Sequence, residues 1–243
     1  MTRPILPGLA ALATIAAAPA LAEIAGGDLT LSYSQFLGDL ETSDGDGTTS
    51  SLGLGGSAEF ALERPFALQV DLNQSQVALI DDTATMLGVH GIYRFGEVTS
   101  LGAFVAHDTV PDSDYTYAGV EAKRIFADFD GEGYLAWAGG EGSDATLWGV
   151  SAAFRRGPNF DLGVAFDRLD GDDDTSLTRL SGRAGYDLTA RAQVAAEFGV
   201  ADVDVADISD TAAFAGVSLR YSFGAFRGAT FDRRGLLQLL PGL

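Results

Sequence analysis

The chain contains no cysteine, a single lysine and only two histidines, His90 and His107. Without cysteine it has neither a disulfide framework nor a thiolate metal site. Two histidines are too few for a histidine-rich metal centre. We therefore expect a protein that works without a bound cofactor.

Positive charge is scarce along the whole sequence. Asp and Glu number 34 against 15 Lys and Arg, which gives a formal net charge of −19. A nucleic-acid partner requires a basic surface, so this charge excludes that class of function. Hydrophobic residues make up 47% of the chain, which is too many for a disordered protein. The 31 glycines disfavour helices and suit strands and turns.

Long apolar runs are confined to the N-terminus. Arg3 precedes an apolar, Ala-rich stretch over 5–19, and Ala20-Leu21-Ala22 matches the small-x-small pattern of a cleavage site. At about 15 residues this stretch is short for a membrane-spanning helix. We expect residues 1–22 to be a cleaved signal peptide. No run of 18 apolar residues follows Glu23, which excludes a helical span of the inner membrane.

The rest of the chain alternates apolar and polar residues with a period of two, which is typical of strands with one apolar face. In 211–223, one face carries Ala213, Ala215, Val217, Leu219, Tyr221 and Phe223. The pattern predicts a β domain over 23–223 with twelve strands, at 27–37, 50–62, 65–74, 84–95, 99–107, 115–125, 132–140, 146–155, 160–168, 177–187, 190–200 and 211–223. Most are about as long as the 9–11 residues with which a tilted strand crosses a bilayer.

Acidic residues collect at one end of these strands. Six expected connections hold 19 Asp and Glu and no Lys or Arg: 38–49, 74–83, 107–114, 139–145, 169–176 and 200–211. The other connections are mostly short turns. Short turns on one side and longer loops on the other are typical of outer-membrane barrels, whose lipid-facing wall tolerates little charge. A soluble β-sandwich or lipocalin-like barrel is the alternative, but its outward apolar stripes would promote aggregation.

Two segments carry a resemblance to a known class. Gly27-Asp28-Leu29-Thr30-Leu31-Ser32-Tyr33 is similar to the first strand, and Gly216-Val217-Ser218-Leu219-Arg220-Tyr221-Ser222-Phe223 to the terminal strand, of Gram-negative outer-membrane β-barrel proteins of the porin-like type. The resemblance implies an all-β, up-and-down antiparallel transmembrane barrel in the bacterial outer membrane. It also implies contact with outer-membrane lipid, lipopolysaccharide and the barrel-assembly machinery.

The alternation predicts which charged side chains line the lumen when the apolar stripe faces lipid. They are Glu59, Asp71, His90, Arg94, Glu121, Lys123, Arg155, Asp161, Asp167, Arg183, Arg191, Glu197 and Arg220. Two interpretations remain open. Opposed charges across an open lumen set its selectivity, whereas charges that pair with one another fill it. A twelve-stranded barrel lies between the filled eight-stranded and the water-filled sixteen-stranded barrels.

Catalytic motifs are absent: the chain has no Gly-x-Ser-x-Gly, His-Glu-x-x-His or phosphate-binding loop. His107-Asp108 is the one fragment that suggests a barrel protease, and such a dipeptide is common by chance, so we expect no enzyme. Asp170, Asp172 and Asp174 have the 1-3-5 spacing that begins a calcium loop. The glycine and distal glutamate of that loop are missing, which leaves a solvated acidic turn or weak divalent binding.

The C-terminal tail, 224–243, continues for twenty residues beyond the last aromatic residue of the terminal strand. Arg227, Arg233 and Arg234 precede a Leu-rich stretch that Pro241-Gly242 ends. This pattern leaves three interpretations of the tail open: an interfacial helix, a plug of the periplasmic mouth, or a disordered tail.

For the whole protein we expect a small porin-like channel for hydrophilic solutes or ions, with acidic loops that favour cations. The alternative is a non-conducting structural or surface-interaction barrel.

Overall fold

The computed structural model describes residues 23–38, 50–77, 82–110, 113–140, 143–172, 175–205, 208–225 and 228–239. The expected signal peptide, 1–22, lies outside the described residues. No helix among them is long and apolar enough to cross a membrane.

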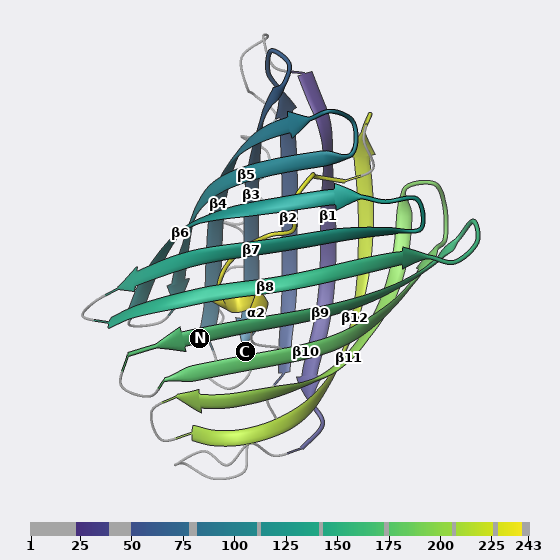
Figure 1. The fold of residues 1–243 in the computed structure, drawn as a ribbon. Helices are drawn as coiled ribbons and strands as arrows, with labels where there is room; N and C mark the ends of the chain where they lie inside the picture. The colour runs from purple at the N-terminus through teal and green to yellow at the C-terminus, as the bar shows by residue number, and fades with distance from the viewer. Residues whose placement is uncertain are drawn as a thin grey trace.

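The described chain forms a closed barrel of twelve antiparallel strands (Figure 1). The strands are β1 (Glu23–Phe36), β2 (Ser50–Ala61), β3 (Phe66–Val77), β4 (Asp82–Phe95), β5 (Thr99–Val110), β6 (Ser113–Ile125), β7 (Phe129–Gly140), β8 (Ser143–Arg155), β9 (Phe160–Gly171), β10 (Ser176–Asp187), β11 (Ala192–Val205) and β12 (Ile208–Gly224). Each strand pairs with its neighbours in sequence, and β1 closes on β12. The all-β, up-and-down barrel with twelve strands is therefore confirmed.

Strand lengths differ from the prediction at the acidic end. The strands continue into segments expected to be loops, so that only residues 111–112 separate β5 from β6 and only 206–207 separate β11 from β12. The stretch 37–49, between β1 and β2, is the one long connection left at this end. Aspartate is depleted in strands, which is why these hairpin ends resemble loops in sequence. Beyond the bilayer both faces of a strand meet water, and the acidic residues are tolerated there.

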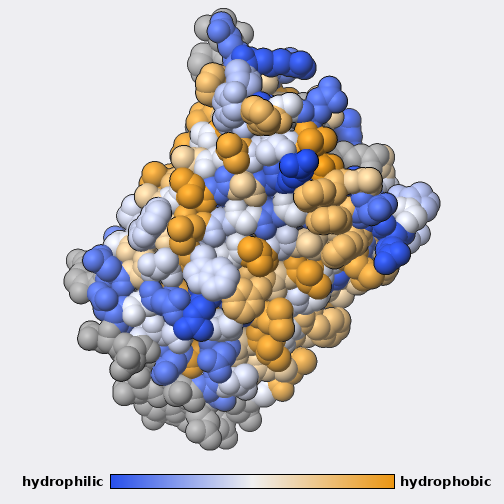
Figure 2. All heavy atoms as spheres, viewed as in Figure 1, coloured by the Kyte–Doolittle hydropathy of each residue, from blue (hydrophilic) through white to orange (hydrophobic). Residues whose placement is uncertain are grey.

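The outer wall is apolar because the period of two sends alternate side chains outward. On β1 and β12 the paired residues Leu31 and Leu219 are 49% and 46% exposed. Figure 2 shows hydrophobic residues spread over the middle of the wall, with hydrophilic residues toward both ends. Outward aromatic side chains gather near the short turns: Phe66, Tyr93, Phe95, Phe126, Phe154, Phe160, Tyr186 and Tyr221. Aromatic girdles of this kind sit at the membrane interface of outer-membrane barrels.

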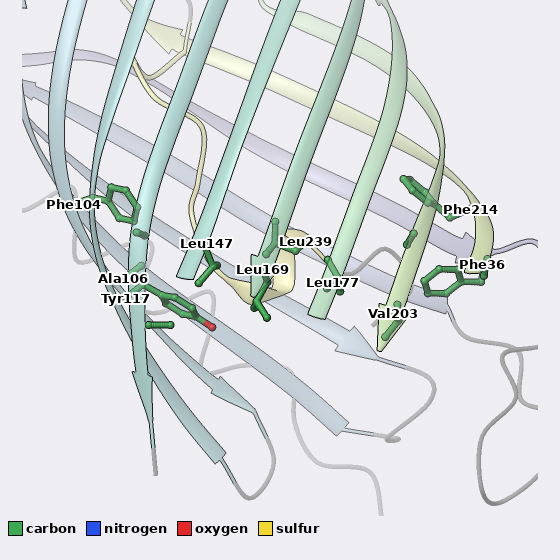
Figure 3. Close-up of a cluster of buried hydrophobic side chains, with 14 residues drawn as sticks. Phe36, Phe104, Ala106, Tyr117, Leu147, Leu169, Leu177, Val203, Phe214 and Leu239 are labelled. Carbon is green, nitrogen blue, oxygen red and sulfur yellow. The ribbon is translucent and has the colours of Figure 1, made fainter. Parts of the chain in front are cut away.

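The interior changes character along the barrel. Toward the acidic end the inward side chains form an apolar cluster, which includes Phe36, Tyr117, Leu147, Leu177 and Phe214. Toward the short-turn end the interior is polar and charged, with buried carboxylates, amides and a histidine. Figure 3 shows the apolar cluster and, beside it, Leu239 from α2 (Leu236–Leu239). The tail of the chain therefore reaches the inside of the barrel.

Candidate functional site: a charged lumen crossed by the C-terminal segment

Residues 228–239, which we call the inner segment, run through the lumen. The chain leaves β12 at the short-turn end, where Gly224 has a positive φ of 83°, and follows the yellow trace in Figure 1 to α2 inside the barrel. At its far end Leu239 is 3% exposed and belongs to the apolar cluster near the acidic end. The inner segment thus extends from one polar end of the lumen to the apolar region near the other.

Wall side chains hold the backbone of the inner segment as they would hold a bound peptide. The amides of Thr230, Phe231 and Asp232 donate to Glu59 Oε2 at 2.9 Å, to Gln69 Oε1 at 3.1 Å and to Glu132 Oε1 at 3.1 Å. Gln69 Nε2 donates in return to the carbonyl of Phe231 at 2.9 Å. Lys123 Nζ donates to the carbonyl of Thr230 at 2.8 Å. These bonds satisfy backbone groups that would otherwise be buried unpaired.

Phe231 anchors the inner segment in the wall. Its side chain is 2% exposed and packs with Ala67 and Ile92. Its ring also stacks on His90, with centroids 6.3 Å apart, and Phe104 stacks on the same imidazole at 5.4 Å. Burial of an aromatic ring of this size contributes about 1.5–3 kcal/mol.

His90 lies between two carboxylates on neighbouring strands. Its Nδ1 is 2.6 Å from Glu121 Oε1, its Nε2 is 2.9 Å from Asp71 Oδ2, and all three side chains are fully buried. Carboxylates only accept hydrogen bonds, whereas a neutral imidazole has a single N–H donor. The arrangement therefore fits a doubly protonated imidazolium that donates to Glu121 and forms an ion pair with Asp71.

Two arginines of the inner segment pair with acids of the wall. Arg233 Nη1 donates to Asp28 at 3.0 Å, and Arg234 Nε donates to Glu121 at 3.1 Å. Arg234 also bonds to Glu132, and its guanidinium lies 4.3 Å from the centroid of the Tyr134 ring. Burial opposes the charged form of Arg234, but Glu132 and Glu121 outweigh this effect and raise its pKa above the ordinary value.

Asp232 is the one acid among the described residues of the inner segment. It faces water in the lumen, yet the surrounding barrel removes part of its hydration, which opposes ionisation. Lys123, Arg220, Arg234 and Arg233 act in the opposite direction and hold the pKa of Asp232 well below its usual range. The carboxylate is therefore ionised at neutral pH.

Two wall glycines leave the space that the inner segment fills. A Cβ on Gly102 would lie 2.7 Å from Cε2 of Phe231, and a Cβ on Gly55 would lie 3.0 Å from Cζ of Arg233. Real Cβ atoms do not approach other atoms as closely as the first of these distances. Glycine at both positions therefore lets the wall accommodate the Phe231 and Arg233 side chains.

The structure places the thirteen predicted lumen residues in two groups. Five lie against the inner segment or beneath it, on β2 to β6: Glu59, Asp71, His90, Arg94 and Glu121. The other eight line a cavity of about 710 Å³ beside the inner segment, to which Lys123 also donates a hydrogen bond: Lys123, Arg155, Asp161, Asp167, Arg183, Arg191, Glu197 and Arg220. The inner segment also borders this cavity, through residues 231–235 among others.

We call Arg155, Arg179, Arg183, Arg191 and Arg220, which all line this cavity, the basic wall. Arg155 pairs with Asp130 at 2.8 Å, Arg183 with Asp161 at 3.2 Å, and Arg179 with Asp167 at 3.4 Å. Arg191 and Arg220 form no ion pair within the described part of the chain. We call the buried acids Asp28, Glu59, Asp71, Glu121 and Glu132 the acidic wall; Asp28 and Glu132 also line the cavity.

Charged residues that line the cavity but were not predicted to face the lumen include Asp28, Glu132, Arg179, Asp130 and Asp187, and the sequence left the position of the C-terminal tail open. For the first three residues, the alternation of apolar and polar positions along the strand does predict an inward side chain. Asp28 precedes the outward Leu29, and Arg179 precedes the outward Leu180. Glu132 lies in a Gly-rich stretch where the apolar face begins only at Leu135. The inner segment has no periodicity, so no sequence pattern predicts its position.

The remaining candidate groups do not assemble into a catalytic or metal centre. His107 is exposed and Asp108 fully buried, because neighbours on β5 point to opposite faces. Asp170 is paired with Arg168 at 2.6 Å, and Asp172 accepts a bond from the Asp144 amide at 3.1 Å. Asp174 lies outside the described residues. Among the residues described, no three His, Asp or Glu side chains form a metal-binding group.

Comparison with known proteins finds relatives only at the level of structure. No protein-family description matches the sequence, and no curated protein matches it. The KdgM porin, solved in complex with disordered oligogalacturonate, matches with a TM-score of 0.56 and 11% identity over 80% of this chain and 99% of KdgM. The NanC porin matches with 0.61 and 7% over 80% and 98%, and an outer membrane channel from Pseudomonas putida F1 with 0.58 and 12% over 82% and 96%. At these identities the similarity establishes the fold, and the fold of this chain is that of the porin-like β-barrels of the Gram-negative outer membrane.

Proposed function

We propose that the protein is a narrow outer-membrane channel for the passive diffusion of small hydrophilic solutes. The observation that carries the proposal is the 710 Å³ cavity with its charged lining, inside a closed barrel whose outer wall is apolar. A polar interior behind a lipid-facing wall is the arrangement of porins. The solved porins with the same fold, KdgM and NanC, support this assignment. We propose no enzymatic activity.

The proposal includes export with removal of residues 1–22 and a mild preference for cations. Exposed acids such as Asp114, Asp144, Asp170 and Asp172 occupy the end of the barrel opposite the short turns. They raise the local concentration of cations at that mouth. Divalent binding at Asp170, Asp172 and Asp174 is at most weak in this proposal, because Arg168 competes for Asp170.

Planar-bilayer recording of the refolded, purified chain tests the channel function. We expect discrete conductance steps and a reversal potential, in a KCl gradient, of the sign that indicates cation preference. Heat-modifiable mobility on gels shows beforehand that the barrel is folded. A folded barrel without any conductance would contradict the proposal.

One observation favours a second candidate function. The inner segment crosses the lumen and is bonded to the wall on β1, β2, β3, β6 and β7. A barrel closed in this way would serve as a non-conducting structural or surface-interaction protein. The same recording separates the two candidates, because only the channel passes ions.

A further inference from the structure

The inner segment is bound to the acidic wall by the interactions expected of a peptide ligand in its site. Backbone amides, an aromatic anchor and two arginines all find matching groups, and Gly55 and Gly102 leave space for the Arg233 and Phe231 side chains. At the same time the inner segment stays at the surface of the cavity, where Asp232 is exposed and Arg233 and Arg234 are partly exposed. It therefore fills part of the lumen and reaches the basic wall at one point, where Arg179 donates to the carbonyl of Gln238 at 3.3 Å, while the cavity remains beside it.

The charges of the inner segment complement the wall that it covers. Its described residues carry two cations, Arg233 and Arg234, and one anion, Asp232. The arginines neutralise Asp28, Glu121 and Glu132 of the acidic wall. With the inner segment in place, the cavity is bordered by the basic wall and its partner acids Asp130, Asp161, Asp167 and Glu197. Asp28 and Glu132 of the acidic wall also border it, but Arg233 and Arg234 are paired with them. Without it, the same lumen would expose the acidic wall to water as well.

We propose that the inner segment is a resident, displaceable plug whose binding site is the acidic wall, and that its release produces a wider and more cation-selective pore. This inference rests on the proposed channel function and adds its regulation. The ligand class for the site is a peptide with an aromatic side chain followed by two cations. In this chain Phe231, Arg233 and Arg234 supply those groups.

The experiment compares the mature chain with a chain that ends at Ala225, both refolded in detergent and shown to be folded by heat-modifiable mobility. Conductance and reversal potential are recorded in planar bilayers across a KCl gradient. We expect conductance to rise by about twofold or more in the shortened chain, because the pore radius controls the flow of ions. We expect the reversal potential to shift toward that of K⁺, since cations have left the lumen and acids have been uncovered.

A synthetic peptide with the sequence of residues 228–239 tests the site itself. Added at millimolar concentration to each side of the bilayer in turn, it should reduce the conductance of the shortened chain toward the native value. A scrambled peptide of the same composition is the matched control and should have no effect. Equal block by both peptides would show that no specific site exists.

Each outcome distinguishes the plug from the channel function. A native chain that conducts as well as the shortened one overturns the plug and leaves the channel function intact. A silent native chain with a conducting shortened chain supports the plug and overturns the proposal that the native chain is open to solutes. Two folded but silent chains overturn both proposals. If the shortened chain fails to fold, a full-length variant with Phe231→Ala, Arg233→Gln and Arg234→Gln takes its place, and unchanged conductance in that variant counts against the plug.

Discussion

Arg233 in the inner segment donates a hydrogen bond of 3.0 Å to Asp28 on the first strand of the barrel, 205 positions earlier in the chain. The side chains are 10% and 8% exposed, so the pair lies away from bulk water. Removing one partner of a buried pair leaves an unpaired charge, which typically costs about 3–5 kcal/mol. This single contact therefore couples the end of the chain to the seam where β1 closes on β12.

The first prediction compares the stabilising effect of this buried ion pair with that of an exposed ion pair whose N–O distance is shorter. Arg168 and Asp170 are 2.6 Å apart, but their side chains are 39% and 47% exposed. Exposed pairs contribute about 0.2–1 kcal/mol because water screens them. We expect Arg233→Gln to lower the free energy of unfolding in lipid vesicles by more than Arg168→Gln does. Equal losses would mean that the buried position of Arg233 has no energetic consequence.

The second prediction tests the two faces of β12. Leu219 is 46% exposed on the outer wall, while its neighbour Ser218 points into the barrel and borders a small polar cavity. We expect Leu219→Arg to reduce folding yield in lipid vesicles far more than Ser218→Arg, because Arg facing lipid costs about 2–4 kcal/mol at the midplane. Similar yields from the two variants would contradict the assignment of faces.

The third prediction concerns the space that Gly102 leaves for Phe231. A valine at position 102 would place its Cβ 2.7 Å from the Phe231 ring and 2.7 Å from Glu121, which is itself bonded to Arg234, so we expect Gly102→Val to displace the inner segment and raise conductance. The control is Gly91→Val on the adjacent strand, where the nearest atom to a Cβ is 3.9 Å away. The control should fold and conduct as the native chain does. A silent or unaltered Gly102 variant that is folded would argue against this role of the glycine.

The fourth prediction follows from the lowered pKa of Asp232. A carboxylate with a depressed pKa stabilises the bound state above its unperturbed pKa of about 3.9 and loses that contribution only as the pH falls through the depressed value. Asp232 therefore stays charged between pH 7 and pH 5, and it should cause no change in conductance over this range. Asp232→Asn should weaken binding of the inner segment and raise conductance at both pH values. A pH-dependent step in the native chain that Asp232→Asn abolishes would disprove this assignment.

The fifth prediction concerns the acidic mouth. We expect the change of Asp170, Asp172, Asp173 and Asp174 to Asn to reduce cation preference in a KCl gradient. At physiological salt the screening length is about 8 Å, so only charges near the entrance act on a passing ion. The effect should therefore shrink as the salt concentration rises. Anion preference in the native pore would contradict the role of these acids.

Sequence patterns predict the wall of this protein but not the contacts that its inward side chains make. The period of two fixes both the number of strands and the face of residues such as Leu219, because lipid and lumen place opposite demands on neighbouring side chains. It does not specify which inward groups meet across the lumen. The pairing of His90 with Asp71 and Glu121 depends on strand register. The position of Phe231 depends on a space left by glycine at position 102, far away in the sequence.

A very short linker joins the inner segment to the barrel that contains its binding site. β12 ends at Gly224 and the inner segment begins at Gly228, so three residues separate them. A ligand tethered this closely has an effective concentration in about the millimolar range, whatever the concentration of the protein. Dilution cannot remove it, and every barrel carries one copy. A molecule that competes for the acidic wall must therefore displace an inner segment that is always present. Even a modest intrinsic affinity of the inner segment for the wall is sufficient to keep it bound.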